Sequence, residues 1–243
     1  MTSRRRADLL LVERGLFPSR AKGQAAIAAG KVTANAALVR APSEEIPLDA
    51  ELHARPEHPW VSRGGVKLAA GLDHFGIDPQ GRVCLDVGAS TGGFTEVLLS
   101  RGARLVYAVD VGRDQLDASL RASSKVVSLE QTDIRTLEPQ RLAEAPDLIV
   151  IDVSFISLRL VFPAVTKLAA VRAELIALTK PQFEVGPGGT KKGIVRDPAL
   201  QARSCEEIAA AAGALGWNVI AVAPSPVLGR EGNREFLLGA RRG

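Results

Sequence analysis

The chain has 243 residues, of which 46% are hydrophobic and 24% are charged, so it can bury a core and lacks the composition of a disordered protein. No apolar run approaches the ~18 residues that a membrane span needs, and the apolar stretch after the basic start is too short for a signal peptide. The two cysteines, Cys84 and Cys205, exclude a disulfide framework and a cysteine zinc site, and they fit the reducing cytoplasm.

Positive charge is concentrated at the amino-terminal end. Residues 1–40 hold eight Arg or Lys against two acidic residues, a balance of +6, whereas the remaining residues hold 23 against 25. A basic end on a near-neutral body is typical of a protein that grips nucleic-acid phosphates with that end. The charge alone fits a solvated helix face equally well.

The basic end predicts two short helices followed by a hairpin. Apolar residues from Ala7 to Leu16 have helical spacing with Gly15 near the end, and Ser19 can cap a second helix that stops at Gly30. Two short strands, 31–34 and 37–39, would turn at Asn35-Ala36. Residues 6–39 resemble the RNA-binding domain named for the fourth protein of the small ribosomal subunit, although members of that family usually have Asn-Gly in the turn.

This resemblance implies that the second helix contacts RNA phosphates, and the arginines before the first helix extend the basic surface. The residues expected to bind RNA in this part of the chain are Arg4, Arg5, Arg6, Ser19, Arg20, Lys22 and Gln24. Residues 53–61, HARPEHPWV, contain two prolines and no periodicity, which predicts a linker. We therefore expect a small α+β RNA-binding domain at 1–57 and a larger domain at 62–243. No third ligand lies near His53 and His58, so no metal site is expected.

From Arg82 onward, strands and helices alternate, which favours a mostly parallel sheet with right-handed crossovers. Seven strands in about 160 residues fit a Rossmann-like α/β fold of the methyltransferase type. The predicted strands are 82–87, 104–109, 125–130, 147–152, 174–179, 218–223 and 234–239. A helix should begin at Pro198 after the cap Asp197. Residues 186–193, GPGGTKKG, predict a flexible basic loop, in which Lys191 and Lys192 are candidates for RNA contacts.

The first of these strands continues into DVGASTGGFT, positions 86–95, a glycine-rich turn that opens a helix. The turn lacks the lysine of a nucleotide-phosphate loop, and an acidic strand end suits a cationic ligand better than a pyrophosphate. Asp110 ends the second strand where it can accept hydrogen bonds from ribose hydroxyls, and Asp133 follows the third strand, within reach of an adenine amino group. We therefore predict S-adenosylmethionine as the cofactor. The residues expected to bind it are Asp86, Gly88, Ser90, Gly92, Gly93, Asp110, Asp133 and Asp152.

Asp152 and Lys180 end two adjacent strands, at the edge where such sheets bind ligands. The motifs SRGGVKL (62–68), DVGASTGGFT, DVSFISL (152–158), LTKPQFEVG (178–186) and GNREFLL (232–238) resemble those of the hemolysin A (TlyA) family, whose catalytic domain is of the FtsJ type. The resemblance covers nearly the whole chain. It implies a ribosomal RNA cytidine-2′-O-methyltransferase with a tetrad on Lys67, Asp152, Lys180 and Glu235.

Methylation of a ribose hydroxyl requires a base, and a lysine serves as a base only in its neutral form. We expect Lys180 to be the general base, with Lys67 as the neighbouring cation that favours the neutral amine and orients the hydroxyl. Asp152 and Glu235 would position the lysines and the methyl group. Arg63 is a further candidate for RNA contact. Phe155 could be a platform for an extruded base, and it could equally be packed in the core.

Three other functions stay open at this stage. The family name suggests a membrane-active hemolysin, the RNA-binding end could belong to a non-catalytic assembly factor, and the glycine turn could serve a nicotinamide oxidoreductase. Because few residues precede the first helix or follow Glu235, the resemblance to shorter family members implies large-subunit (23S) ribosomal RNA as the target, with small-subunit (16S) RNA less supported. The expected partner is ribosomal RNA or a ribosomal subunit in the cytoplasm, with no membrane and no metal; the oligomeric state does not follow from the sequence.

Overall fold

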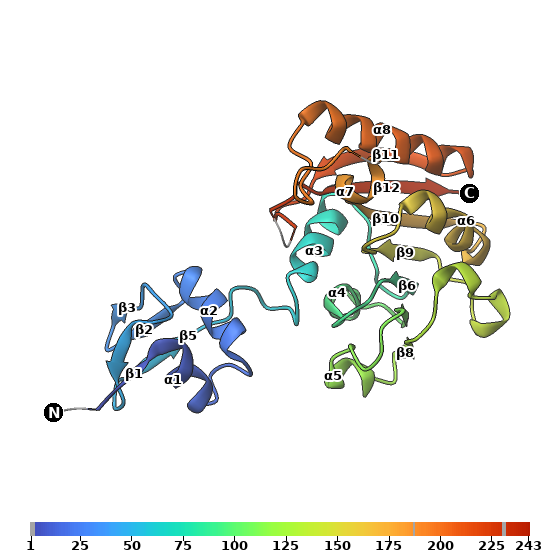
Figure 1. Ribbon diagram of the computed structural model, residues 1–243. Coiled ribbons are helices and arrows are strands. Elements are labelled where there is room, and N and C mark those ends of the chain that lie inside the picture. The colour runs from blue at the N-terminus through green and yellow to red at the C-terminus, as the bar shows by residue number, and fades with distance from the viewer. Residues whose placement is uncertain (1–2, 187, 230–231) are drawn as a thin grey trace. The chain divides into compact units, whose positions relative to one another are not determined.

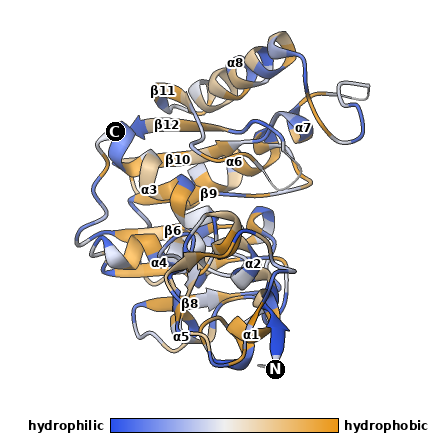
Figure 2. Ribbon diagram, turned by 90° about the vertical axis from the view of Figure 1, so that its left-hand side faces the viewer, coloured by the Kyte–Doolittle hydropathy of each residue, from blue (hydrophilic) through white to orange (hydrophobic). Residues whose placement is uncertain are grey.

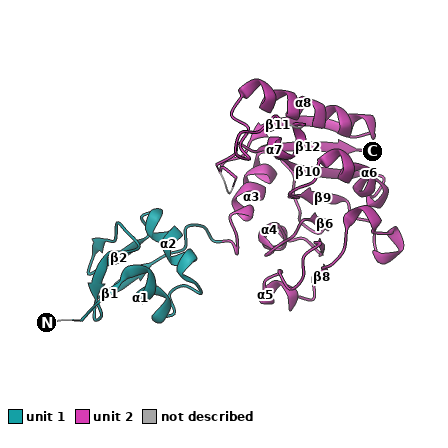
Figure 3. Cartoon of the chain, in the orientation of Figure 1, with its two compact units in different colours: residues 1–59 teal, residues 60–243 magenta. Residues whose placement is uncertain are grey.

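A computed structural model describes residues 3–186, 188–229 and 232–243 of the chain (Figure 1). The chain forms two compact units, residues 1–59 and 60–243 (Figure 3). The first unit contains the basic end of the sequence and the second contains the alternating strands and helices. Position 187, in the predicted basic loop, lies outside the described residues.

The first unit has two helices and two small antiparallel sheets. Helix α1 spans Ala7–Glu13 and helix α2 spans Arg20–Ala28, and the Ser19 side chain caps α2 by accepting a hydrogen bond from the Lys22 amide. The strands are β1 (Arg4–Arg6), β2 (Val32–Ala34), β3 (Ala37–Leu38), β4 (Glu45–Pro47) and β5 (Leu52–Ala54). One sheet pairs β1 with β4, and the other has the order β3-β2-β5. The predicted helices and the hairpin are confirmed.

The predicted linker, residues 53–61, begins too early in the sequence. His53 and Ala54 belong to β5, where His53 is the register partner of Thr33. Both prolines of HARPEHP, Pro56 and Pro59, follow this strand, so its backbone remains free to pair. The hairpin turn is confirmed with both central residues at positive φ, Asn35 at 49° and Ala36 at 63°. Alanine is uncommon at such angles, where glycine usually stands.

The second unit is built on a seven-stranded sheet of order β11-β12-β10-β9-β6-β7-β8. Only β12 runs opposite to the other six strands, since it pairs antiparallel with both β10 and β11. The bounds of the strands are Val83–Val87 (β6), Leu105–Val109 (β7), Val126–Leu129 (β8), Leu148–Ile151 (β9), Ala173–Thr179 (β10), Asn218–Pro224 (β11) and Phe236–Arg242 (β12). All seven predicted strands are confirmed, and the fold is a mixed α/β, Rossmann-like methyltransferase fold.

Helices cover both faces of this sheet because alternate residues of each buried strand point to opposite sides. Cys84, Val106 and Val150 pack with α3 (Gly64–Phe75) and α4 (Gly93–Ser100). Leu85, Tyr107 and Ile149 pack with α6 and α8 on the other face. The remaining helical segments are α5 (Ala118–Arg121), η1 (Ile134–Thr136), η2 (Pro139–Arg141), α6 (Leu158–Leu168), α7 (Pro181–Glu184) and α8 (Pro198–Ala214). Figure 2 shows the central strands as hydrophobic and β1 as hydrophilic.

Local sequence signals explain where the functional helices begin. Asp197 caps α8 by accepting a hydrogen bond from the Ala199 amide, and Pro198 occupies the first helical position, as predicted. Ser157 caps α6 in the same way through the Arg159 amide. Lys180 is the residue before α7, and Pro181 begins that helix. Lys180 therefore lies at the point where β10 ends and α7 begins.

Candidate active site

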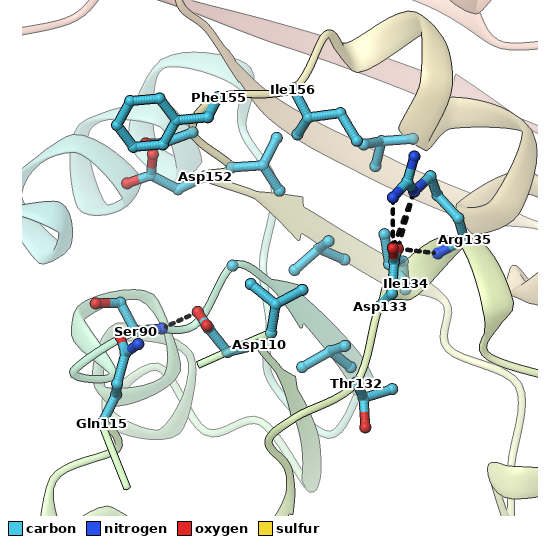
Figure 4. A pocket seen from close by; sticks show the side chains of 17 residues that line it. Ser90, Asp110, Gln115, Thr132, Asp133, Ile134, Arg135, Asp152, Phe155 and Ile156 are labelled. Carbon is cyan, nitrogen blue, oxygen red and sulfur yellow. Dashed lines mark hydrogen bonds and ion pairs between the residues drawn. The ribbon is translucent and has the colours of Figure 1, made fainter. Parts of the chain in front are cut away.

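A cavity of about 570 Å³ opens at the carboxyl ends of β6, β7 and β9 (Figure 4). Its polar lining includes three carboxylates, those of Asp110, Asp133 and Asp152. Its apolar lining includes Val87, Val109, Ile134 and Val161. The volume and the mixture of apolar walls with a few polar groups are those of a small-molecule site.

The glycine-rich turn forms one wall of this cavity. Gly88 has φ 84°, and a Cβ at this position would lie 2.6 Å from the Asp152 backbone oxygen, so only glycine fits here. Ser90 has φ 47°, and its amide donates a 2.8 Å hydrogen bond to Asp110 Oδ2. The turn thus brings the ends of β6, β7 and β9 together. Gly92 and Gly93, also predicted to bind the cofactor, begin α4 and do not line the cavity.

Two of the predicted acidic residues face the cavity and are already oriented by local hydrogen bonds. Asp110 accepts from the Ser90 amide and, through Oδ1, from the Gly112 amide at 2.7 Å. Asp133 caps η1 and forms an ion pair with Arg135. These bonds hold the pKa of Asp133 below its ordinary value, mainly through the Arg135 side chain. The Asp133 carboxylate therefore stays ionised, and both side chains are held in place before any ligand binds.

Asp86 does not lie where sequence reasoning placed it. It is fully buried and absent from the cavity lining, and its Oδ2 accepts a 2.7 Å hydrogen bond from Thr95 Oγ1 on α4. The reason is strand alternation: Asp86 is in phase with Cys84, on the α3 and α4 face, whereas Leu85 and Val87 point toward the cavity face. Burial, with repulsion from Asp152 and Asp110, raises the pKa of Asp86 to about 7 against the pull of the Thr95 hydrogen bond.

Lys180 and Asp152 form an ion pair beside the cavity. Lys180 Nζ lies 2.5 Å from Asp152 Oδ1 and donates a 3.0 Å hydrogen bond to Ser154 Oγ. Lys180 is buried, and both of its partners line the cavity. Because β9 and β10 are adjacent parallel strands, their ends place these two side chains together, as the sequence predicted.

Lys67 and Glu235 form a second, more deeply buried ion pair. Lys67 Nζ on α3 donates a 2.6 Å hydrogen bond to Glu235 Oε2. Glu235 lies one residue before β12 rather than within the strand, and the register pairs the next residue, Phe236, with Thr179. The Lys67–Glu235 pair therefore approaches the end of β10, where Lys180 follows Thr179. Gly229 permits this arrangement, since a Cβ there would lie 2.4 Å from Glu235 Oε1.

Phe155 stands on the same loop as Asp152. It is 91% exposed and has φ 64°, an angle that is costly for a bulky residue. Its ring lies against that of Phe183, with centroids 5.1 Å apart and an interplanar angle of 50°. Of the two sequence-based interpretations, packing in the core is wrong for Phe155. Strain at a cavity wall, held by a second aromatic ring, is typical of a functional position.

Sequence reasoning missed three residues that hold these loops. Ser154 binds Lys180, and Glu184 on α7 accepts hydrogen bonds from Ser157 and Leu158. Asn233 accepts from the Val195 amide and donates to the Gly193 carbonyl, which ties the predicted basic loop to the segment before Glu235. Each lies within three residues of a predicted catalytic position or within the same motif, but their partners are 26 to 40 residues away in sequence.

The predicted RNA-binding residues of the first unit are partly engaged with one another. Arg6, Arg20 and Gln24 all donate hydrogen bonds to the buried carboxylate of Asp8, and Arg5 forms an ion pair with Glu13. These donors hold the pKa of Asp8 far below its ordinary value, the Arg6 side chain foremost. Arg4 donates to the Glu45 carbonyl. Lys22 is exposed and has no ion pair within the described residues.

Two features are absent from the described part of the chain. No helix there is both long and apolar enough to cross a lipid bilayer. No group of three or more His, Cys, Asp or Glu side chains there is arranged to hold a metal ion. In the second unit, Arg63 precedes α3, and Lys191 and Lys192 lie in the loop held by Asn233; all three are exposed.

Comparison with known proteins gives concordant matches. The family model described as FtsJ-like methyltransferase matches residues 60–242. The chain is 46% identical over 244 residues to the 16S/23S rRNA (cytidine-2′-O)-methyltransferase TlyA of Mycobacterium tuberculosis, covering 99% of this chain and 91% of that protein. It is 40% identical over 179 residues to the 23S rRNA (cytidine-2′-O)-methyltransferase TlyA of Campylobacter jejuni, covering 73% and 69%. A structure from Streptococcus thermophilus described as a hemolysin aligns with a TM-score of 0.78 and 39% identity, covering 100% of this chain and 90% of that one.

Proposed function

We propose that this chain, which belongs to the TlyA family of FtsJ-like methyltransferases, methylates a cytidine ribose 2′-hydroxyl of ribosomal RNA in the cytoplasm. Large-subunit RNA is the substrate named for both of the methyltransferase relatives above, and small-subunit RNA is named for one. We therefore place 23S RNA first. The observation that carries the proposal is the Lys180–Asp152 ion pair, joined to Ser154, at the edge of the carboxylate-lined cavity.

The cavity fits S-adenosylmethionine on its own chemistry. Asp110 ends β7 where it can accept hydrogen bonds from two ribose hydroxyls, and Asp133 is the acceptor placed for an adenine amino group. The carboxylates also favour a ligand that carries a sulfonium and an amine, and the described residues that line the cavity include no lysine that could hold a pyrophosphate. When bound, S-adenosylmethionine supplies an electrophilic methyl group. Calorimetry on the pure protein should show that it binds S-adenosylmethionine and not NAD.

The residues at the cavity edge divide the remaining work. In its neutral form, Lys180 Nζ would accept the proton of the 2′-hydroxyl, and bound S-adenosylmethionine would supply the methyl group that replaces this proton on the oxygen. Asp152 and Ser154 hold the amine in place, which is the contribution expected of positioned groups in a proton transfer. The Lys67–Glu235 pair orients the hydroxyl from the β12 side. Phe155 offers an exposed ring on which the extruded cytosine can stack.

RNA recognition is assigned to exposed cations of both units. In the first unit these are Arg4, Arg5, Lys22 and the arginines arranged around Asp8, with Ser19 at the start of α2. In the second unit they are Arg63, Lys191 and Lys192. The affinity that such contacts give falls as the salt concentration rises. Each phosphate contact contributes roughly 0.7–0.9 to the negative slope of log K against log salt concentration.

Methyl transfer to purified ribosomal RNA and to isolated subunits tests this function, with the modified nucleotide located by mass spectrometry. Lys180→Ala should lower the rate by about 10²–10⁴-fold while leaving cofactor affinity within a few-fold. Lys180→Arg should fail almost as badly, because a guanidinium stays charged and cannot accept the proton. Lys167→Ala is the matched control, since Lys167 forms an exposed ion pair with Glu138 at the far end of α6. Near-full activity of the arginine variant would remove the general-base role from Lys180.

A further inference from the structure

Glu184 is a buried acid that the mechanism above does not use. It is the last residue of α7, four residues after Lys180. Its Oε2 accepts a 2.5 Å hydrogen bond from Ser157 Oγ, and its Oε1 accepts a 2.9 Å hydrogen bond from the Leu158 amide. Both partners belong to the amino-terminal end of α6, where a carboxylate also meets the positive end of the helix dipole.

These two bonds are the last of three connections between residues 152–158 and residues 180–184. Lys180 binds Asp152 and Ser154 at one end, and Phe183 contacts Phe155 in the middle. Glu184 then binds Ser157 and Leu158 at the other end. The segment from Lys180 to Glu184 and the segment from Asp152 to Leu158 therefore run side by side, joined by an ion pair, an aromatic contact and a pair of hydrogen bonds.

The segment that Glu184 holds is the one that needs support. It supplies Asp152, Ser154 and Phe155 to the cavity wall, and it carries Phe155 at φ 64°. A strained backbone of this kind persists only where the surrounding structure fixes it. Glu184 is buried, so its carboxylate does not exchange these bonds for water, and losing them would leave Leu158 N–H to find another partner.

We propose that Glu184 is a positioning residue for methyl transfer, which fixes the Asp152–Leu158 segment so that Lys180 and Phe155 meet the target nucleotide in the reactive geometry. The inference rests on the proposed function. It assigns no contact with the cofactor to Glu184, because the cavity lining does not include this residue. A displacement of the wall by about 1 Å can cost about 10²-fold in rate. Asp152, one of the predicted cofactor residues, lies on this segment, whereas Asp110 and Asp133 lie on other loops and should keep most of the cofactor affinity.

The test compares Glu184→Ala with Glu184→Gln. Glutamine keeps an oxygen for the Leu158 amide and an NH₂ group that can donate to Ser157 Oγ, whereas alanine removes both bonds. We expect Glu184→Ala to lower kcat on ribosomal RNA by about 10–100-fold with cofactor affinity within threefold. Glu184→Gln should restore kcat to within about fivefold of wild type. Asp147→Ala is the stability control, because Asp147 pairs with Arg82 next to the start of β9, at the opposite end of the sheet.

Several results would overturn this inference. They are a wild-type kcat for Glu184→Ala, a loss of cofactor affinity equal to the loss of kcat, or a loss of kcat that Asp147→Ala reproduces at the same drop in Tm. If Glu184→Ala does not fold, Ser157→Ala takes its place, since it removes the Ser157 bond to Glu184 and the α6 cap to the Arg159 amide but keeps the Leu158 bond; a wild-type kcat for that variant also overturns the inference. Absence of methylation by the wild-type protein would instead refute the proposed function.

Discussion

The buried acid Asp86 should make the stability of the protein depend on pH in an unusual direction. Burial raises the pKa of Asp86 to about 7, whereas the ordinary pKa of an aspartate is 3.8. The folded protein therefore keeps the proton on Asp86 up to about pH 7. Between these values the folded state binds more protons than the unfolded chain, so stability from this group is highest at low pH and is lost as pH rises toward 7. The free energy of unfolding should therefore fall by about 2–3 kcal/mol between pH 5 and pH 8 through Asp86.

The assay is urea unfolding of the wild type and of Asp86→Asn at several pH values, so that titrations common to both proteins cancel in the difference. Asparagine keeps an acceptor for Thr95 but cannot ionise, so the two stability curves should converge at low pH and separate in favour of the variant as pH rises. Asp147→Asn, at a half-buried position that pairs with Arg82, is the control substitution of the same chemical type. Curves for Asp86→Asn and the wild type that stay parallel from pH 5 to pH 8 would refute the argument, whatever the absolute cost of the substitution.

Two further outcomes follow from other groups. Asp8→Ala should cost roughly 1–3 kcal/mol of stability in the first unit, because three donors lose a buried acceptor, and it should weaken RNA binding. Glu13→Ala is the control and should have neither effect. Equal effects of the two substitutions, in calorimetry and in RNA binding, would contradict the role of Asp8. Phe155→Gly should relieve an unfavourable φ and leave stability within about 1 kcal/mol of wild type, yet lower methyl transfer; a fully active glycine variant would show that the exposed ring is not used.

The sheet of the second unit could be predicted because its strands are buried. Runs such as LIVI and LIAL are continuous apolar stretches bounded by polar residues, the pattern of parallel strands covered on both faces. The short strands β1, β4 and β5 gave no such signal. Three residues are too few to show a period, and their pairing depends on partners far away in sequence, as between Arg4 and Pro47.

The residues of the site likewise include some that the sequence could predict and some that it could not. Asp152 and Lys180 were predictable because carboxyl ends of parallel strands converge, which requires only the order of the elements. Glu184 was not, since its role depends on where the start of α6 lies relative to α7. The placement of Asp86 could have been found from the sequence: it is two residues from Cys84 in the same strand, so both side chains must point to the same covered face.

The charges of the site place catalysis and RNA affinity on different residues. Lys67 and Lys180 each pair with a carboxylate within hydrogen-bonding distance, so the tetrad as a whole has no excess positive charge to attract a phosphodiester. We therefore expect attraction to RNA to come from exposed cations outside the tetrad, among which Lys22, Lys191 and Lys192 have no ion pair within the described residues. A buried pair such as Lys67–Glu235 resists screening, so salt should weaken RNA binding without disturbing the tetrad. Because RNA affinity and catalysis depend on different charges, added salt should increase KM while kcat stays nearly constant.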